Sequence, residues 1–318
     1  MKNRNSILLP AMLAGLLAGP AAAVTIHFDY SYDGGFFSGS NLSRRTTLDA
    51  AGQYFSALLQ DSLAAIDSNG SNQFTAVFSR PDSGATANLA SFDVTADTLT
   101  VFVGGRDLGG NSLGLGGPGG YSISGTQSFL NQAAYRGESG AQTNPPTDFA
   151  TWGGSISFDA DSAWYFDSDP ASTESFSGFD FYSVALHELG HVLGIGTANS
   201  WSRWLQGGKF TGLESKLVNG GQDVLLSADA AHWQSGQTST INGLGSYQAA
   251  MTPNIAAGTR KNFTDLDLAA LSDIGWEVAA TTPARQVPLP EPAYWLFAMG
   301  LAAIGQRLLG RDAAPLPG

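Results

Sequence analysis

The chain has no cysteine, and only four of its 318 residues are histidine. The absence of cysteine excludes disulfide bonds and thiolate ligands, so any bound zinc must be held by histidine, aspartate, glutamate or water. Basic residues are also scarce, since 15 Lys and Arg stand against 27 Asp and Glu and give a net charge of −12. This charge argues against nucleic acid as a partner and is typical of a soluble exported protein.

Residues 1–23 have the composition of a secretory signal peptide. Lys2 and Arg4 precede an apolar run, and the small residues Ala21 and Ala23 form a cleavage site. We therefore predict that the signal ends at Ala23 and that the protein works outside the cytoplasm. The signal is not expected to take part in the fold.

A second apolar stretch lies near the C-terminus, at residues 293–304. A proline–glutamate–proline motif precedes it and two arginines follow it, at Pro290, Glu291, Pro292, Arg307 and Arg311. This order resembles the PEP-CTERM sorting tail, which implies a Gram-negative exporter, processing by exosortase-type machinery and delivery to the cell envelope or an exopolysaccharide matrix. The tail would span residues 288–312, after a linker at 279–287. A plain membrane anchor is the alternative, and membrane contact is expected only through this tail.

Residues 24–278, between the two ends, predict one large domain with α and β structure. Alternating β-branched and aromatic residues predict strands at 24–32, 72–80 and 96–108. Apolar residues at helical spacing predict a helix over 46–66. This order of elements is that of an α/β subdomain built on a twisted sheet. Residues 109–125 are so rich in glycine that we expect a long loop there.

The most informative segment is HELGHVLGIG at residues 187–196. Residues four apart share one face of a helix, so a helix over 179–194 allows His187 and His191 to bind one metal ion. Glu188 stands beside them, as in the HExxH zinc peptidases, where the glutamate is the general base. Gly194 and Gly196 are suited to ending the helix. A catalytic zinc needs a third protein ligand as well.

The decamer resembles the HExxHxxG motif of the metzincin proteases, in which the glycine turns the chain toward a third histidine. Thr197 occupies the usual place of that histidine, and a threonine hydroxyl is a poor ligand for zinc. In leishmanolysin-like metzincins a distant histidine followed by tryptophan returns to the metal, and His232-Trp233 fits that pattern. The resemblance therefore implies zinc held by His187, His191 and His232.

The resemblance runs from about residue 150 to 278. The sequence AAMTPN at 249–254 resembles the methionine turn, which gives Met251 a structural place under the metal, as Gly194 has in the turn after the helix. Residues 262–278 resemble the closing helix and final strand of such domains. The fold expected is a metzincin-like zincin with an N-terminal subdomain at 24–196 and a loop-rich C-terminal subdomain at 197–278.

Two other third ligands stay open on sequence alone. Glu214 would complete the zinc in a gluzincin, although the glycines after the helix argue against that family. Asp229, just ahead of His232, is a further candidate. His27 is most simply a strand residue.

Residues 153–164 resemble the segment that precedes the active-site helix in matrixins, where it helps to bind calcium. Asp159 and Asp161 are therefore candidate Ca²⁺ ligands, with an acidic surface turn as the alternative. The expected function is a secreted zinc endopeptidase that hydrolyses protein or peptide substrates, with Glu188 as general base. A non-catalytic surface or matrix binding protein on a degenerate protease fold is the alternative, because Thr197 leaves the usual site incomplete.

Overall fold

The computed structural model describes residues 23–279, except residues 40, 168, 170, 171 and 173. The predicted signal peptide and sorting tail lie outside the described residues. The chain divides after Ala279 into two units, and the first contains every residue described below. Within these residues, no helix has both the length and the apolar character needed to cross a membrane.

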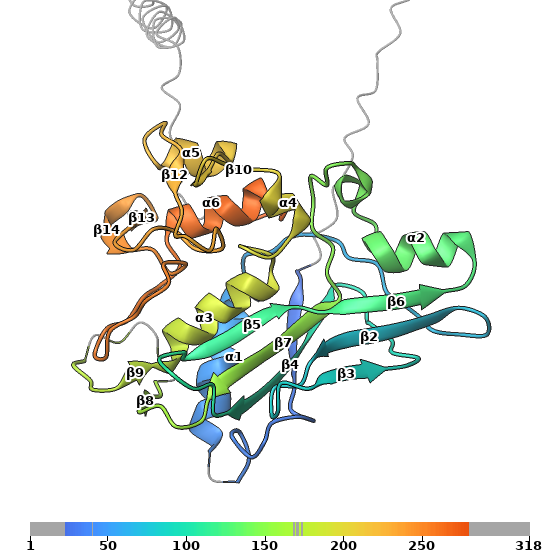
Figure 1. The fold of residues 1–318 in the computed structure, drawn as a ribbon, viewed down its shortest axis with the longest axis horizontal. Helices are drawn as coiled ribbons and strands as arrows, with labels where there is room; N and C mark the ends of the chain where they lie inside the picture. Colours follow the sequence, from blue (N-terminus) through green and yellow to red (C-terminus); the bar gives the residue numbers. More distant parts are fainter. Residues whose placement is uncertain (1–22, 40, 168, 170–171, 173, 280–318) are drawn as a thin grey trace, which may run out of the picture. The chain divides into compact units, whose positions relative to one another are not determined.

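A four-stranded mixed sheet in the order β1–β4–β7–β5 forms the centre of the fold (Figure 1). Strands β1 (Thr25–Asp29), β4 (Thr98–Arg106) and β7 (Gly153–Asp159) are parallel, and β5 (Gly114–Pro118) is the antiparallel edge strand. The strands predicted at 24–32 and 96–108 are therefore present, each a few residues shorter. The mixture of sheets and helices confirms the predicted α/β class.

Strand β4 contributes to two cores because alternate side chains of a strand point to opposite faces. Leu99, Val101 and Val103 join the larger core, between the sheet and helices α1 (Leu42–Ser56) and α3 (Phe181–Val192). Phe102 points the other way and stacks on Phe78, with ring centroids 4.1 Å apart. The elements around this second core are β2 (Gln73–Ser79), β3 (Thr86–Leu89), β6 (Gly120–Ser124) and α2 (Gln127–Tyr135).

The helix predicted over residues 46–66 is wrong at both ends. Helix α1 begins at Leu42 and ends at Ser56, and residues 57–66 form no helix. Leu59 and Ile66 make isolated bridges to Val278 and Val94, and both side chains are buried. Pairing with distant backbone thus overrides the helical spacing of the apolar residues. The final strand predicted before residue 278 is reduced to the bridge at Val278.

The long loop predicted at 109–125 is also wrong, because β5 and β6 lie within it. Glycine disfavours strands in general, but here it is required where other groups approach closely. A Cβ atom on Gly116 would lie 2.6 Å from the carbonyl oxygen of Glu188, and one on Gly119 would lie 2.0 Å from the Trp152 ring. The glycines therefore let β5 run directly against the helix that carries the HExxH motif.

The segment after α3 forms small elements around one aromatic cluster. Trp201 stacks on Phe210 with centroids 4.1 Å apart, and both rings contact Trp233. The helix predicted within 262–278 is present as α6 (Asp265–Asp273). The other elements are α4 (Asn199–Ser202), β10 (Leu205–Gln206), β11 (Lys209–Phe210), α5 (Leu213–Val218), β12 (Val224–Leu225), β13 (Thr238–Ile241) and β14 (Leu244–Gln248).

An ion-pair group ties this segment to the start of α3. Arg260 donates to Asp180 at 3.0 and 3.1 Å and to Asp167 at 2.9 Å. Asp180 is also the N-cap of α3, where it accepts a hydrogen bond from the backbone of Ser183. The start of the HExxH helix is thereby fixed against the chain that follows Met251. The remaining short elements are η1 (Ser139–Gln142), β8 (Trp164–Tyr165) and β9 (Phe179–Asp180).

Candidate metal centre

Helix α3 ends where two glycines reverse the chain. Gly194 and Gly196 have φ values of +104° and +75°, a region that side chains other than glycine rarely adopt. A Cβ atom on Gly196 would lie 2.4 Å from the carbonyl oxygen of Ala231. Glycine is therefore needed for the end of α3 to contact the segment that carries His232.

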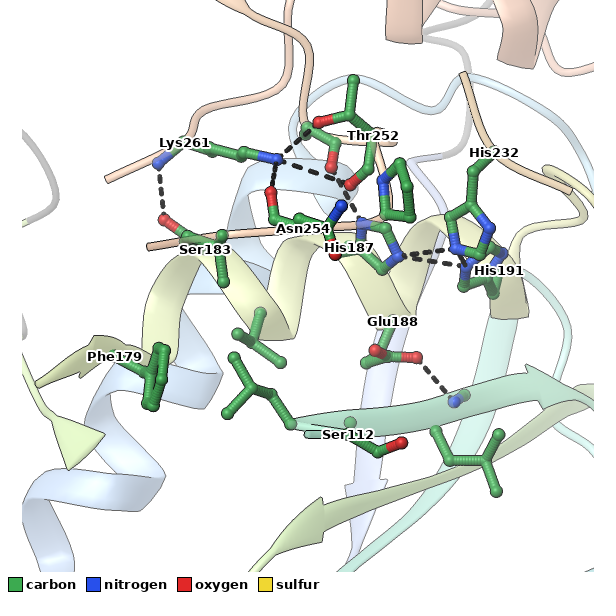
Figure 2. A pocket seen from close by; sticks show the side chains of 18 of the residues that line it. Ser112, Phe179, Ser183, His187, Glu188, His191, His232, Thr252, Asn254 and Lys261 are labelled. Atoms are coloured by element: carbon green, nitrogen blue, oxygen red, sulfur yellow. Dashed lines mark hydrogen bonds between the residues drawn. The ribbon is translucent and has the colours of Figure 1, made fainter. Parts of the chain in front are cut away.

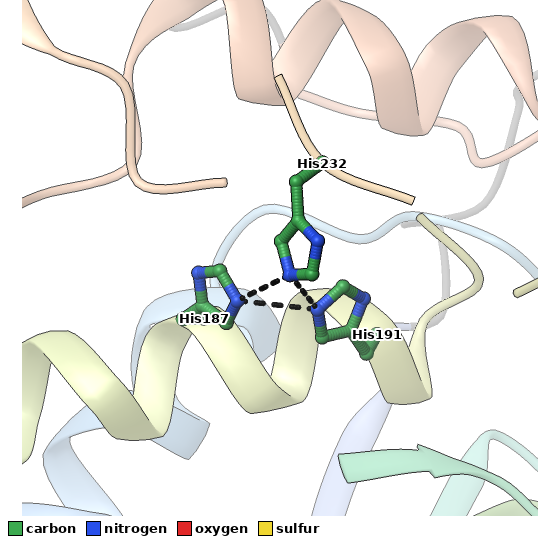
Figure 3. Close-up of side chains that lie close together, drawn as sticks. All are labelled: His187, His191 and His232. Carbon is green, nitrogen blue, oxygen red and sulfur yellow. Dashed lines mark hydrogen bonds between the residues drawn. The ribbon is translucent and has the colours of Figure 1, made fainter. Parts of the chain in front are cut away.

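The imidazole rings of His187, His191 and His232 meet at one point above α3 (Figure 3). Their three Nε2 atoms are 3.0 to 3.2 Å apart. Among the described residues, they are the only group of three or more His, Cys, Asp or Glu side chains placed to hold a metal ion. The structure thus brings together the three residues that the resemblance implied as ligands.

The partner of each Nδ1 atom fixes the tautomer of its ring. His187 and His191 bond the carbonyl oxygens of Ala250 and Ile195, both at 2.8 Å. His232 bonds the Asp229 carboxylate at 2.8 Å. These oxygens can only accept, so each Nδ1 carries the hydrogen and each Nε2 presents a lone pair.

Three lone pairs at this separation repel one another unless a cation lies between them. Tetrahedral zinc with Zn–N bonds of about 2.0 to 2.1 Å sets its nitrogen ligands about 3.3 Å apart. The observed separations of 3.0 to 3.2 Å are close to that value. The donor set and its geometry therefore fit a zinc ion.

The electrostatics of the site also suit a cation. Burial lowers the pKa of His187 well below its usual value and lowers the pKa of His191 to about 4, so both rings are neutral at neutral pH. Burial raises the pKa of Asp229, but hydrogen bonds from Ser227, Ala231 and His232 outweigh it and hold this pKa at about 2. Asp229 is therefore an anion that orients the His232 ring.

Glu188 lies next to the histidines and is only 6% exposed. One of its carboxylate oxygens accepts a 2.6 Å hydrogen bond from the backbone N–H of Gly116 in β5. Burial raises the pKa of Glu188 to about 8, and the bond from Gly116 opposes that shift. A cation at the histidines would oppose it further, because positive charge favours the carboxylate.

Met251 lies beneath the centre. It is fully buried, and a Cβ atom on Gly190, between the two histidines of α3, would lie 2.6 Å from its sulfur. Gly190 therefore provides the space that the methionine fills. Met251 supports the helix from below, whereas its neighbour Ala250 holds the His187 ring.

Asp267 in α6 is a positioning residue that the sequence analysis missed. Its buried carboxylate accepts hydrogen bonds from the backbone N–H groups of Ala250 and Met251, at 2.9 and 3.2 Å. It also accepts from the indole of Trp233 at 2.8 Å and from Thr264. One carboxylate thus fixes the turn that holds His187 and the residue next to His232.

The other candidate ligands lie elsewhere. Thr197 donates its hydroxyl to the carbonyl oxygen of His191 at 2.7 Å and so closes the helix end. Glu214 is exposed in the first turn of α5 and does not join the histidine group. His27 lies in β1 opposite Thr100. Asp229 contacts His232 and is not a member of the metal-binding group.

The calcium expectation concerns Asp159 and Asp161. Asp159 ends β7, where it accepts hydrogen bonds from Leu108 at 3.1 Å and Ser162 at 2.6 Å. Asp161 is exposed. In the described part of the chain neither belongs to a group of three or more His, Cys, Asp or Glu side chains, and a calcium ion at this place stays a prediction.

The histidines and Glu188 line a cavity of about 690 Å³ (Figure 2). One wall is the chain at 110–116, including the start of β5, and the floor is α3. The opposite wall is formed by Ala250, residues 252–255 and Lys261. A substrate in this cavity would lie between the edge strand and the turn after Met251.

Comparison with known proteins agrees with this site. The family model described as Matrixin matches residues 128–204, which include α3 and its motif but end before His232. Metalloendoproteinase 1 of Glycine max is 46% identical over 48 residues, which cover 15% of this chain and 16% of that protein. No solved structure matches. The matches support a metzincin-type protease. The chain covers less than two thirds of the length of this relative.

His232→Ala should lower zinc affinity by more than about 100-fold, because two histidines leave the ion weakly held. Competition with a chelator of known affinity measures this change. His27→Ala, which removes an imidazole from β1, is the matched control and should bind zinc like the wild type. Equal affinity in the two variants would show that His232 is not a ligand.

Asp267→Asn should lower the free energy of unfolding by about 3 kcal/mol, because an amide nitrogen replaces one acceptor and leaves buried donors unpaired. It should also weaken zinc binding by about tenfold, as the loss of an outer-shell support does. Chemical denaturation and chelator competition measure the two effects. Asp265→Asn is the control, since Asp265 in the same helix bonds the β13–β14 hairpin instead. Similar zinc affinity in both variants would contradict the role of Asp267.

Proposed function

We propose that the protein is a zinc-dependent endopeptidase. The observation that carries the proposal is the convergence of three Nε2 lone pairs beside a buried glutamate in one cavity. A structural zinc site would have four protein ligands, whereas three histidines leave a position open. The proposed ligands are His187, His191 and His232.

The residues of the site would have separate roles in peptide hydrolysis. A bound zinc ion would acidify a water molecule and polarise the substrate carbonyl. Gly116 holds one oxygen of the Glu188 carboxylate, and the other has no hydrogen-bond partner among the described residues. That second oxygen can take the water proton and pass it to the leaving amine. Asp229, Ala250 and Ile195 keep the imidazoles in orientation.

The edge strand β5 supports a peptide as substrate. It pairs only with β7 in its sheet, and Gly114, Leu115 and Gly116 line the cavity. An extended peptide can add to an open strand edge through backbone hydrogen bonds. A protein or peptide chain is therefore the substrate class that suits this cavity.

The alternative of a non-catalytic binding protein rested on Thr197. The Nε2 atom of His232 lies 3.0 Å from that of His191 and 3.2 Å from that of His187, which supports His232 as the third ligand in place of Thr197. Intact Glu188 beside the histidines also favours catalysis.

We further propose that the protein is exported by a Gram-negative cell and retained at the envelope or in its matrix. The support is in the sequence alone, namely the signal-like residues 1–23 and the PEP-CTERM-like segment 288–312. Exosortase-type machinery would be the processing partner.

Glu188→Gln should keep zinc bound and lower kcat/KM for peptide hydrolysis by at least about 100-fold, because the amide cannot accept the water proton. Cleavage of a protein substrate, followed by mass spectrometry, gives the rate, and metal analysis gives the zinc content. Glu214→Gln replaces an exposed glutamate outside the cavity and serves as control. Activity of Glu188→Gln within about threefold of the control would reject the proposed role.

A chain ended after Ala284 should leave the envelope fraction and retain wild-type zinc content, because Val278 is the last of the described residues that packs against the core. Fractionation of cells that express the full and the shortened chain measures retention. Loss of zinc or aggregation of the shortened chain would show that the tail belongs to the fold.

A further inference from the structure

Lys261 is a buried cation in the wall of the proposed active-site cavity. Its side chain lines the same cavity as the three histidines and Glu188 and is only 4% exposed. In Figure 2 it lies on the side of His187 opposite His232. Its ammonium group donates to the carbonyl oxygens of Thr252 and Asn254 and to the Thr252 hydroxyl. All of these acceptors are neutral.

The Asp267 carboxylate compensates this charge in part, from beyond salt-bridge distance. Among the described residues, no carboxylate lies within salt-bridge distance of the Lys261 ammonium. Glu188 is the only acidic residue of the cavity lining, and its hydrogen bond goes to Gly116. Burial lowers the pKa of Lys261 to about 8, so the side chain is still mostly protonated at neutral pH. An unpaired buried charge is costly, and an incoming anion would offset part of that cost.

The position of this cation is fixed relative to the metal centre. The backbone N–H of Lys261 donates to the Ser183 hydroxyl at 2.7 Å, and Ser183 lies one turn before His187 in α3. Thr252, which accepts from the ammonium, is two residues from Ala250, which holds the His187 ring. The ammonium is therefore held at a fixed place before a substrate enters, which favours selective recognition.

The surroundings define what kind of group would fit. Val184, Pro253 and Ile255 contribute apolar surface to the same cavity. Such a site suits an anionic group on a short aliphatic stem, because the stem contacts the walls while the charge meets the ammonium. A lysine or arginine side chain would meet like charge there.

We propose that Lys261 makes the enzyme select substrates with aspartate or glutamate next to the scissile bond. This inference rests on the proposed endopeptidase function and adds a substrate class to it. Lys261 sets specificity and takes no part in the bond cleavage.

The test compares peptides that differ in one charge. A cleaved bond is first located by mass spectrometry, and peptides with Glu, Gln, Asp, Asn, Leu or Lys at each flanking position are then assayed for kcat/KM. The zinc-loaded wild type should prefer Glu to Gln at one flanking position by at least about tenfold, and Lys should be the poorest. Asp should exceed Asn in the same way.

Lys261→Met removes the charge and keeps most of the side-chain volume. It should bring the Glu to Gln ratio of kcat/KM to about one. Lys209→Met, at an exposed lysine of β11 outside the cavity, should leave the ratio unchanged.

A wild-type ratio near one at both flanking positions overturns the inference, and this measurement does not depend on how any variant folds. A wild-type ratio that persists in a folded Lys261→Met enzyme also overturns it. Failure of the zinc-loaded wild type to cleave any peptide would instead overturn the proposed function, and the specificity with it. Cleavage without acidic preference would leave the proposed function standing.

Discussion

The buried carboxylate of Asp267 is the interaction on which the centre depends. Its two oxygens accept five hydrogen bonds, from Thr264, Trp233, Ala250 and Met251. Burial raises the pKa of this group, and the donors oppose that shift by favouring the charged form. The bonds to Thr264 cap α6, while the others hold two segments that meet only in the folded chain. One anion thus joins the last helix, the methionine turn and the residue beside His232.

The three histidine rings are oriented by two backbone carbonyl groups and one carboxylate. His191 is oriented by the turn that follows its own helix, His187 by the turn at Ala250, and His232 by the neighbouring Asp229. A site built in this way needs no cysteine, because convergence and a fixed tautomer make the imidazoles sufficient ligands. Such a metal site is sensitive to small changes in the spacing of the backbone segments. Gly190 and Gly196 are places where a single methyl group would displace Met251 or the segment that carries His232.

Local patterns in the sequence predicted the parts of this structure that local physics determines. HELGH predicted a helix with two histidines on one face, whereas the distant third ring, His232, was implied only by the resemblance to leishmanolysin-like metzincins. The sequence did not predict β5, because its glycines are typical of a loop and their reason, contact with Glu188 and Trp152, lies in the tertiary fold. The helix over 46–66 was placed wrongly for a similar reason, since Leu59 and Ile66 make isolated backbone bridges to Val278 and Val94. Asp267 carried no signal, because an aspartate in the first turn of a helix is ordinary.

The turn after the methionine has two anchors with different partners. Ala250 and Met251 are held by Asp267, which also supports the His232 segment, whereas Thr252 and Asn254 are held by Lys261. A substitution that breaks the bonds to Asp267 would move the turn that holds His187 and the segment that carries His232. Thr252 and Asn254, which Lys261 holds, form part of the cavity wall. Substitution of either side chain would leave the hydrogen bond between the Ala250 carbonyl and His187 in place. Because the boundary falls between Met251 and Thr252, the proposed metal binding and the proposed substrate selection are supported by adjacent residues with separate attachments. The fold thereby allows the specificity of the cavity to vary on an unchanged metal centre.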